Sequence, residues 1–185
     1  MSLLPKQNYR FNREIPLPEG LINGQALGAV SGMKFGLSNM SRSGCEVIAI
    51  YNALLLHHRP APFLEIARYM ERFRVLLGFW GANFLSLGHC LKHYGLRAVR
   101  VRQPQKVEDA LLAGRTVVYV YWVKKRFRSS VHTVVLQKGR DVLCVYNAYN
   151  RCGHVLHIGM EDYLRNRNMI FGYIIEQDSE KNIGA

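Results

Sequence analysis

The hydrophobic periodicity of this chain changes near residue 95, and this change constrains the fold more than any other feature. Before it, apolar residues recur every three or four positions, as Val47, Ile50, Tyr51 and Leu54 do, which is typical of helices that bury one face. After it, apolar residues alternate with polar ones or form short β-branched runs, which is typical of strands. Helices followed by strands predict an α+β fold with an antiparallel sheet.

The residue pattern also predicts where the elements lie. The expected helices cover residues 43 to shortly before Pro60, 62–74, 83–94, 104–113 and 161–165. The expected strands cover residues 97–101, 116–123, 131–137, 142–147, 155–158 and 169–176.

Length and composition indicate one globular domain. The chain has 185 residues, which fits a single domain of ordinary size. Its content of 49% hydrophobic and 21% charged residues excludes wholesale disorder. We expect an irregular lead-in over residues 1–38, where prolines interrupt any helix, a folded domain over residues 39–178, and a polar tail over residues 179–185.

The chain is basic. Its 25 Lys and Arg residues exceed its 13 Asp and Glu residues, and the resulting charge of +12 favours acidic partners. The densest cluster, Lys124–Arg128, predicts a preference for acidic substrates or surfaces. The other arginines are dispersed along the sequence, so a nucleic-acid-binding domain is the less favoured alternative.

No targeting or membrane segment is apparent. Residues 1–13 lack the apolar stretch of a signal peptide, and the longest mostly apolar run, residues 47–56, is too short to cross a bilayer. We therefore expect a cytoplasmic protein without a membrane span. Its four cysteines are then free thiols.

Cys45 is the cysteine with the most distinctive surroundings. Ser43 to Glu46 has the S-x-x-E form of a capping box, which predicts that Ser43 caps a helix and that Glu46 reaches back. Cys45 then lies in the first turn, where unpaired amides and the helix dipole favour a thiolate. The carboxylate of Glu46 opposes this effect, so Cys45 needs a basic partner. Packing at the helix start is the alternative role.

A predicted hairpin supplies such a partner. If Lys138–Asp141 is the turn, Gln137 faces Val142, and His132 then lies directly opposite Asn147. An imidazole that acts as a base needs a third group to orient it and select its tautomer. His132 and Asn147 therefore form a candidate catalytic pair, with a hydrogen-bonded core pair as the alternative.

The order Cys, His, Asn resembles that of the papain-like cysteine peptidases. Residues 43–54, 131–135 and 145–147 are similar to the compact bacterial branch, which includes the bacteriocin-processing peptidases that cut after double-glycine leaders. The resemblance implies a papain-like catalytic domain over residues 39–178, with the Cys helix packed on the C-terminal antiparallel sheet.

The resemblance also implies roles for four residues. Cys45 would be the nucleophile, His132 the general base and acid, Asn147 the orienting residue, and Asn39, six residues before Cys45, the oxyanion donor. The implied function is thiol-dependent hydrolysis of a peptide or other amide bond through an acyl-enzyme, with a peptide or protein as partner. Two alternatives stay open: an acyltransferase that uses the same intermediate, and a peptide-binding module without catalysis.

The remaining histidines and cysteines are the other candidates for metal ligands. His89 and His93 are four residues apart on an expected helix, but no Glu lies between them as in a zincin. Cys144 and the segment 152–157 contain zinc-ligand residue types without an established spacing. No phosphate-binding glycine motif is present. We therefore expect neither a metal nor a cofactor.

Overall fold

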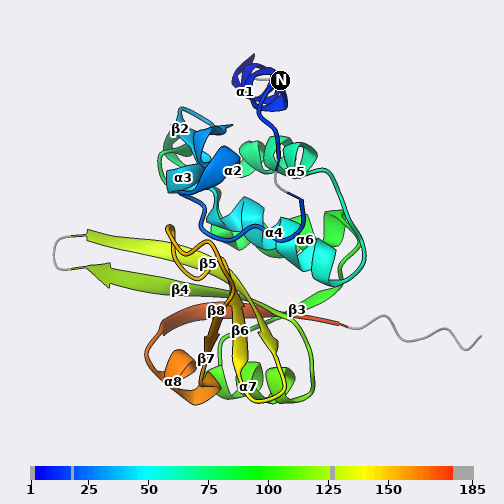
Figure 1. Cartoon of the computed structure of the whole chain (residues 1–185), viewed down its shortest axis with the longest axis vertical. Helices are drawn as coiled ribbons and strands as arrows, with labels where there is room; N and C mark the ends of the chain where they lie inside the picture. Colours follow the sequence, from blue (N-terminus) through cyan, green and yellow to red (C-terminus); the bar gives the residue numbers. More distant parts are fainter. Residues whose placement is uncertain (1–2, 18, 126–127, 177–185) are drawn as a thin grey trace, which may run out of the picture.

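The computed structural model describes residues 3–17, 19–125 and 128–176. Within them, the centre of the molecule is a six-stranded antiparallel sheet with strand order β3-β8-β4-β5-β6-β7 (Figure 1). Its strands are β3 (Ala98–Val101), β4 (Val117–Lys125), β5 (Arg128–Lys138), β6 (Leu143–Tyr146), β7 (Leu156–Ile158) and β8 (Asn168–Ile175). These strands overlap the six that the sequence predicts.

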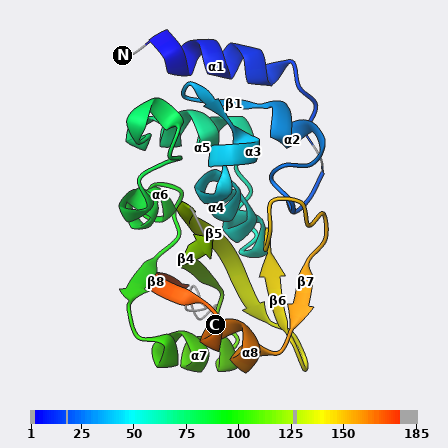
Figure 2. The same cartoon turned by 90° about the vertical axis from the view of Figure 1, so that its left-hand side faces the viewer.

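Helices cover the sheet on both faces. The α-helices are α1 (Leu3–Arg13), α2 (Gly28–Gly32), α3 (Met40–Ser43), α4 (Cys45–Leu56), α5 (Phe63–Met70), α6 (Leu87–His93), α7 (Pro104–Leu112) and α8 (Met160–Arg165). Short 3₁₀ helices, η1 (Glu71–Phe73), η2 (Leu76–Gly78) and η3 (Phe84–Ser86), link α5 to α6. Figure 2 shows α4, α5 and α6 on one side of the sheet and α7 and α8 on the other.

The sheet separates two hydrophobic cores. On β4, Val118 and Val120 belong to the core under α4, α5 and α6, whereas Val117 and Tyr119 belong to the core under α7 and α8. Because both faces of β4 are buried, its sequence is a continuous apolar run. Helix α4 is buried almost all round, which explains its hydrophobic sequence. The predicted α+β class, with the Cys helix packed against a C-terminal antiparallel sheet, is confirmed.

The N-terminal region is more regular than predicted. Residues 1–38 were expected to be irregular, yet they contain α1, α2 and the strand β1 (Lys34–Phe35), which pairs with β2 (Ser38–Asn39). The buried groups of α1 are asparagines: Asn8 Nδ2 donates to the Glu71 carboxylate at 2.7 Å, and Asn12 Oδ1 accepts from the Lys34 amide at 2.7 Å. A helix that contacts the rest of the fold through side-chain amides does not need an apolar face, so its sequence lacks the apolar periodicity by which helices are predicted.

The predicted hairpin register is wrong by two residues. The partner of Gln137 is Cys144 rather than Val142, and the β5–β6 ladder ends at the pair of Val135 and Tyr146. The turn is shifted because Gly139 N donates to the Val142 carbonyl at 2.8 Å and thus closes the loop after Lys138. His132 and Asn147 are therefore not a directly opposed pair.

Two predicted segments fall outside the described residues. They are the polar tail, residues 179–185, and residues 126–127 of the basic cluster. Figure 1 shows strands β4 and β5 reaching beyond the other strands. Among the described residues, no helix combines the length and the hydrophobicity needed to span a lipid bilayer.

Candidate active site

Cys45 is the first residue of α4, but the predicted capping box does not form. The N-cap is Gly44, with φ −99° and ψ 0°, and it makes no side-chain cap. Ser43 instead ends α3, and its hydroxyl contacts the Ser38 hydroxyl at 3.2 Å. The Glu46 carboxyl group accepts a hydrogen bond from the Cys45 thiol at 3.3 Å rather than reaching back to a cap. Cys45 is 6% exposed at this helix start.

His132 lies on β5, and its ring is held by a backbone group. Its Nε2 is 2.8 Å from the carbonyl oxygen of Asn147. Because a carbonyl oxygen only accepts hydrogen bonds, Nε2 carries the proton of the neutral ring. The lone pair is then on Nδ1. The Tyr121 ring packs edge-on against the imidazole, with centroids 5.8 Å apart. His132 therefore has a fixed orientation and one basic nitrogen.

The side chain of Asn147 does not orient His132. Its Oδ1 accepts a hydrogen bond from the backbone amide of Gln25 at 3.2 Å, and its Nδ2 donates to the side-chain Oε1 of Gln25 at 3.4 Å. Asn147 follows β6 with φ 58°, a left-handed conformation that Asn tolerates better than most residues. The side chain thus holds the backbone in the conformation that aims its carbonyl at His132. The predicted contact between the two residues exists, but through the main chain.

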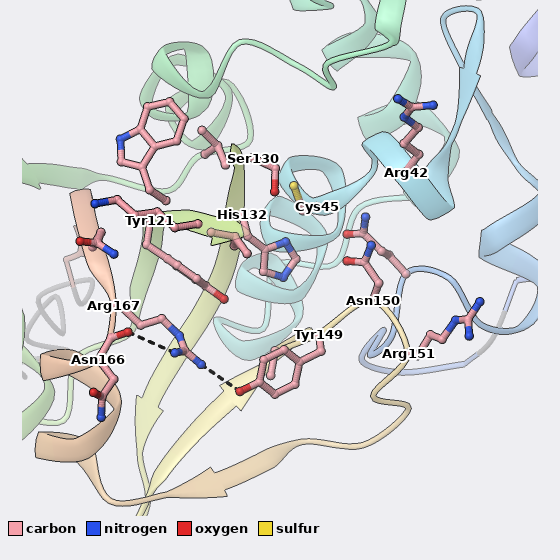
Figure 3. A pocket seen from close by; sticks show the side chains of 17 residues that line it. Arg42, Cys45, Tyr121, Ser130, His132, Tyr149, Asn150, Arg151, Asn166 and Arg167 are labelled. Atoms are coloured by element: carbon pink, nitrogen blue, oxygen red, sulfur yellow. Dashed lines mark hydrogen bonds between the residues drawn. The ribbon is translucent and has the colours of Figure 1, made fainter. Parts of the chain in front are cut away.

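Cys45 and His132 line the same pocket, which has a volume of about 690 Å³. Its walls come from the β4–β5 hairpin, the loop after β6 and residues 166–168, together with Gln25 and Arg42. Figure 3 shows the Cys45 thiol and the His132 ring together in the middle of this pocket. The pocket is large enough for several residues of an extended peptide.

Burial opposes charge on both groups. It raises the pKa of the Cys45 thiol well above its usual value, and the neighbouring Glu46 raises it further. The Glu46 carboxyl group is itself buried, which raises its pKa to about 7. Burial also lowers the pKa of His132, against the hydrogen bond to Asn147. The free protein thus holds a neutral thiol and a neutral imidazole, and the thiolate expected from the helix start is not favoured.

The structure places the thiol next to the strand that carries His132. The Thr133 backbone donates a hydrogen bond that lowers the pKa of Cys45, although burial dominates. Thr133 directly follows His132 on β5. Two segments more than 80 residues apart in the sequence therefore bring a thiol and an imidazole to one site.

Comparisons with known proteins find similarity in structure rather than in sequence. No family model matches the chain, and no curated protein matches it. A similar solved structure is a double glycine motif protease from an AMS/PCAT transporter, crystallised in complex with the leader peptide. The two chains are 19% identical with a TM-score of 0.49, over 72% of this chain and 84% of that one. We therefore take the function from the residues of the site.

Asn39 is not among the residues that line the pocket. Its Oδ1 accepts a hydrogen bond from the Ser41 hydroxyl at 2.7 Å. Gln25 instead lines the pocket, and its Nε2 donates to the Ser41 carbonyl at 3.1 Å. Sequence reasoning missed Gln25 because it lies in a glycine-rich segment without a motif. The oxyanion role of Asn39 stays a prediction, and nothing in its contacts supports it.

The remaining thiols have other surroundings. Cys90 is buried, which raises its pKa to about 11. Cys144 and Cys152 each lie 3.6 Å from one histidine nitrogen, of His157 and His154 respectively. Within the part of the chain that the structure describes, no three His, Cys, Asp or Glu side chains are grouped to hold a metal ion. Cys45 alone among the cysteines lines the pocket together with a histidine.

Proposed function

We propose that this chain is a thiol-dependent hydrolase that cleaves peptide bonds through an acyl-enzyme, on a papain-like scaffold. One observation carries the proposal: Cys45 lies at a helix start in the same pocket as His132, whose proton is held on Nε2 by the Asn147 carbonyl. A nucleophile, an adjacent base and a group that orients the base are the parts that covalent catalysis needs.

The chemistry follows from the tautomer. His132 Nδ1 accepts the proton of the Cys45 thiol as the sulfur attacks the substrate carbonyl carbon. The resulting imidazolium donates that proton to the leaving amine as the C–N bond breaks, which leaves a thioester on Cys45. Water then attacks the thioester, gives a proton to Nδ1 and releases the acid, and the sulfur recovers the proton. The Asn147 carbonyl stabilises the transient imidazolium through Nε2–H.

The start of α4 supplies a donor for the oxyanion. The first intrahelical hydrogen bond of α4 joins Ile48 N to the Gly44 carbonyl at 3.0 Å, so the amides before it have no partner four residues back. We assign the oxyanion to the amide of Cys45, because the Glu46 amide already donates to the Glu46 carboxyl group. A donor of this type contributes about 10²–10³ in rate.

The test is turnover of a peptide library in H₂¹⁸O, with the products identified by mass spectrometry. We expect cleaved peptides with one ¹⁸O in the new carboxylate, and none from Cys45→Ala. Cys152→Ala is the matched control, because this thiol is partly exposed and outside the pocket. Products joined to an added amine would instead identify an acyltransferase. Binding without any product would identify a peptide-binding module and contradict the proposal.

The role of the Asn147 backbone makes a further prediction. Asn147→Ala should lower the free energy of unfolding by about 2–3 kcal/mol, because it leaves the buried Gln25 amide without its acceptor and strains φ. Asn147→Gly should lose about 1 kcal/mol less, since glycine tolerates positive φ. Both should keep turnover within about tenfold when folded, because the carbonyl remains. Denaturant unfolding and turnover assays measure these effects.

The contrary result would be informative. If folded Asn147→Gly loses as much turnover as His132→Ala, the amide side chain orients the imidazole and the backbone assignment is wrong.

A further inference from the structure

Arg167 lines the pocket and is held by aromatic rings. Its guanidinium lies 4.8 Å from the ring centroid of Tyr163, 5.5 Å from that of Tyr121 and 5.9 Å from that of Tyr149. Its Nη2 donates to the Tyr149 hydroxyl at 2.9 Å, and its Nη1 donates to the Asn166 carbonyl at 3.2 Å (Figure 3). A long side chain fixed in this way loses little further freedom when it binds a ligand.

The pocket that contains Arg167 is lined by further basic side chains. Arg42, Lys124 and Arg151 also line the pocket, and no Asp or Glu of the described residues is among its lining. The hydrogen-bond acceptors that face Arg167 are neutral oxygens, a hydroxyl and a carbonyl. Guanidinium groups pair best with carboxylates, which accept two parallel N–H bonds. The pocket therefore provides a positive site without an internal anion.

Arg167 is also close to the proposed base. Figure 3 shows His132 between Cys45 and Arg167. The guanidinium charge lowers the pKa of His132, although burial of the ring has the larger effect. A ligand group bound at Arg167 is thus within the same pocket as the bond that Cys45 would attack.

We propose that Arg167 is a specificity-determining residue that binds a carboxylate of the peptide substrate and selects peptides with an acidic group near the scissile bond. This inference rests on the proposed peptidase function. It assigns the acidic preference to one preorganised arginine inside the pocket, whereas the net charge of +12 only favours acidic partners in general. The carboxylate is either an Asp or Glu side chain or the C-terminal carboxylate of a short peptide.

Such a contact would also assist catalysis. A bound carboxylate offsets the guanidinium charge beside His132 and so favours formation of the imidazolium. With a substrate that lacks the acidic group, the guanidinium charge of Arg167 remains uncompensated while His132 accepts the proton of the thiol. The contact therefore acts on the transition state as well as on binding.

The first experiment uses the unmodified protein. Matched peptides carry Glu or Gln at each position around the bond cleaved in the library, with a free or an amidated C-terminus, and kcat/KM is measured for each. We expect the Glu peptide to exceed the Gln peptide by about 10–100-fold at one position. Loss on amidation alone would identify the C-terminal carboxylate as the group recognised. Equal rates for all these peptides would overturn the inference and leave the peptidase function standing.

Variants then assign the effect to Arg167. Arg167→Gln should remove the preference, while Arg167→Lys should keep part of it, since a lysine retains the charge without the fork. Arg165→Gln is the matched control, because Arg165 is exposed, pairs with Glu161 and is not part of the pocket lining. A folded Arg167→Gln that retains the full preference would contradict the assignment.

Binding separates this inference from the proposed function. Cys45→Ala should bind the Glu peptide at least about tenfold more tightly than the Gln peptide, and Arg167→Gln in that background should remove the difference. If this holds while the unmodified protein cleaves nothing, the carboxylate site is correct and the peptidase function fails. If cleavage occurs but neither binding nor kcat/KM depends on the acid, the inference fails.

Discussion

Cys45→Ala and His132→Ala should each lower kcat/KM for peptide cleavage by at least about 10³-fold, and the double variant should lose no more than either single variant. The thiol and the imidazole exchange one proton in the proposed mechanism, so neither is effective without the other. The activity that remains should come from substrate binding and the backbone amide at the start of α4.

The measurement is a full kinetic comparison of these three variants with the unmodified protein. Cys144→Ala is the matched control, since Cys144, on β6, also lies near a histidine nitrogen, that of His157 on β7, but outside the pocket. Circular dichroism checks that each variant is folded. Multiplicative losses in the double variant would mean that the two residues act independently, and the shared proton would be wrong.

The buried carboxyl group of Glu46 should lower the free energy of unfolding by about 3 kcal/mol as the pH rises from 4.5 to about 7, and Glu46→Gln should remove this loss. The pKa of Glu46 is raised from 4.5 to about 7 by burial, so the folded protein binds this proton more tightly than the unfolded chain. Its contribution to stability is present below pH 4.5 and is lost as the pH rises through about 7. At about 1.4 kcal/mol for each pH unit between the two pKa values, the total loss is about 3 kcal/mol.

The measurement is denaturant unfolding of the two proteins between pH 4.5 and 8. The stability of Glu46→Gln relative to the unmodified protein should increase between pH 4.5 and about 7 and then level off. His132 has the opposite dependence, because its lowered pKa removes stability as the pH falls, but this effect is common to both proteins and cancels. Glu161→Gln, on the exposed face of α8, is the matched control. Parallel curves for Glu46→Gln and the unmodified protein would mean that the carboxyl group is ionised in the fold throughout.

The same substitution should also affect the thiol. Above pH 7 the ionised carboxyl group of Glu46 disfavours a thiolate on Cys45. Glu46→Gln should therefore increase the rate of alkylation of Cys45 by iodoacetamide at pH 8, measured by mass spectrometry of the labelled peptides. A rate unchanged by the substitution would show that burial alone sets the reactivity of the thiol.

Hydrophobic pattern was sufficient to predict most of the fold. The change of period near residue 95 predicts the six strands and the α+β class, because burial on both sheet faces leaves apolar runs. It did not predict α1, whose attachment uses the amides of Asn8 and Asn12. It also misplaced the β5–β6 turn, because one hydrogen bond at Gly139, rather than the charged residues beside it, closes the loop.

The candidate site was predictable where a motif marks it and not where distant contacts form it. Cys45 and His132 are identifiable from local sequence and from their order. Gln25 bonds to Asn147 across 122 residues, and Arg167 lies at the junction of α8 and β8, so no local pattern indicates either. The capping box failed because Ser43 belongs to the separate helix α3 and Gly44 takes the cap position.

The main-chain contact to His132 has a consequence for how such a site can vary. Every residue type carries a carbonyl group, so the group that holds the imidazole is not encoded by the side chain at position 147. What the position must keep is a left-handed backbone, which glycine, asparagine and aspartate adopt most readily. A search pattern that demands a particular third side chain would overlook proteins built in this way. A search of structures for any oxygen atom beside the Nε2 atom of the histidine would find them.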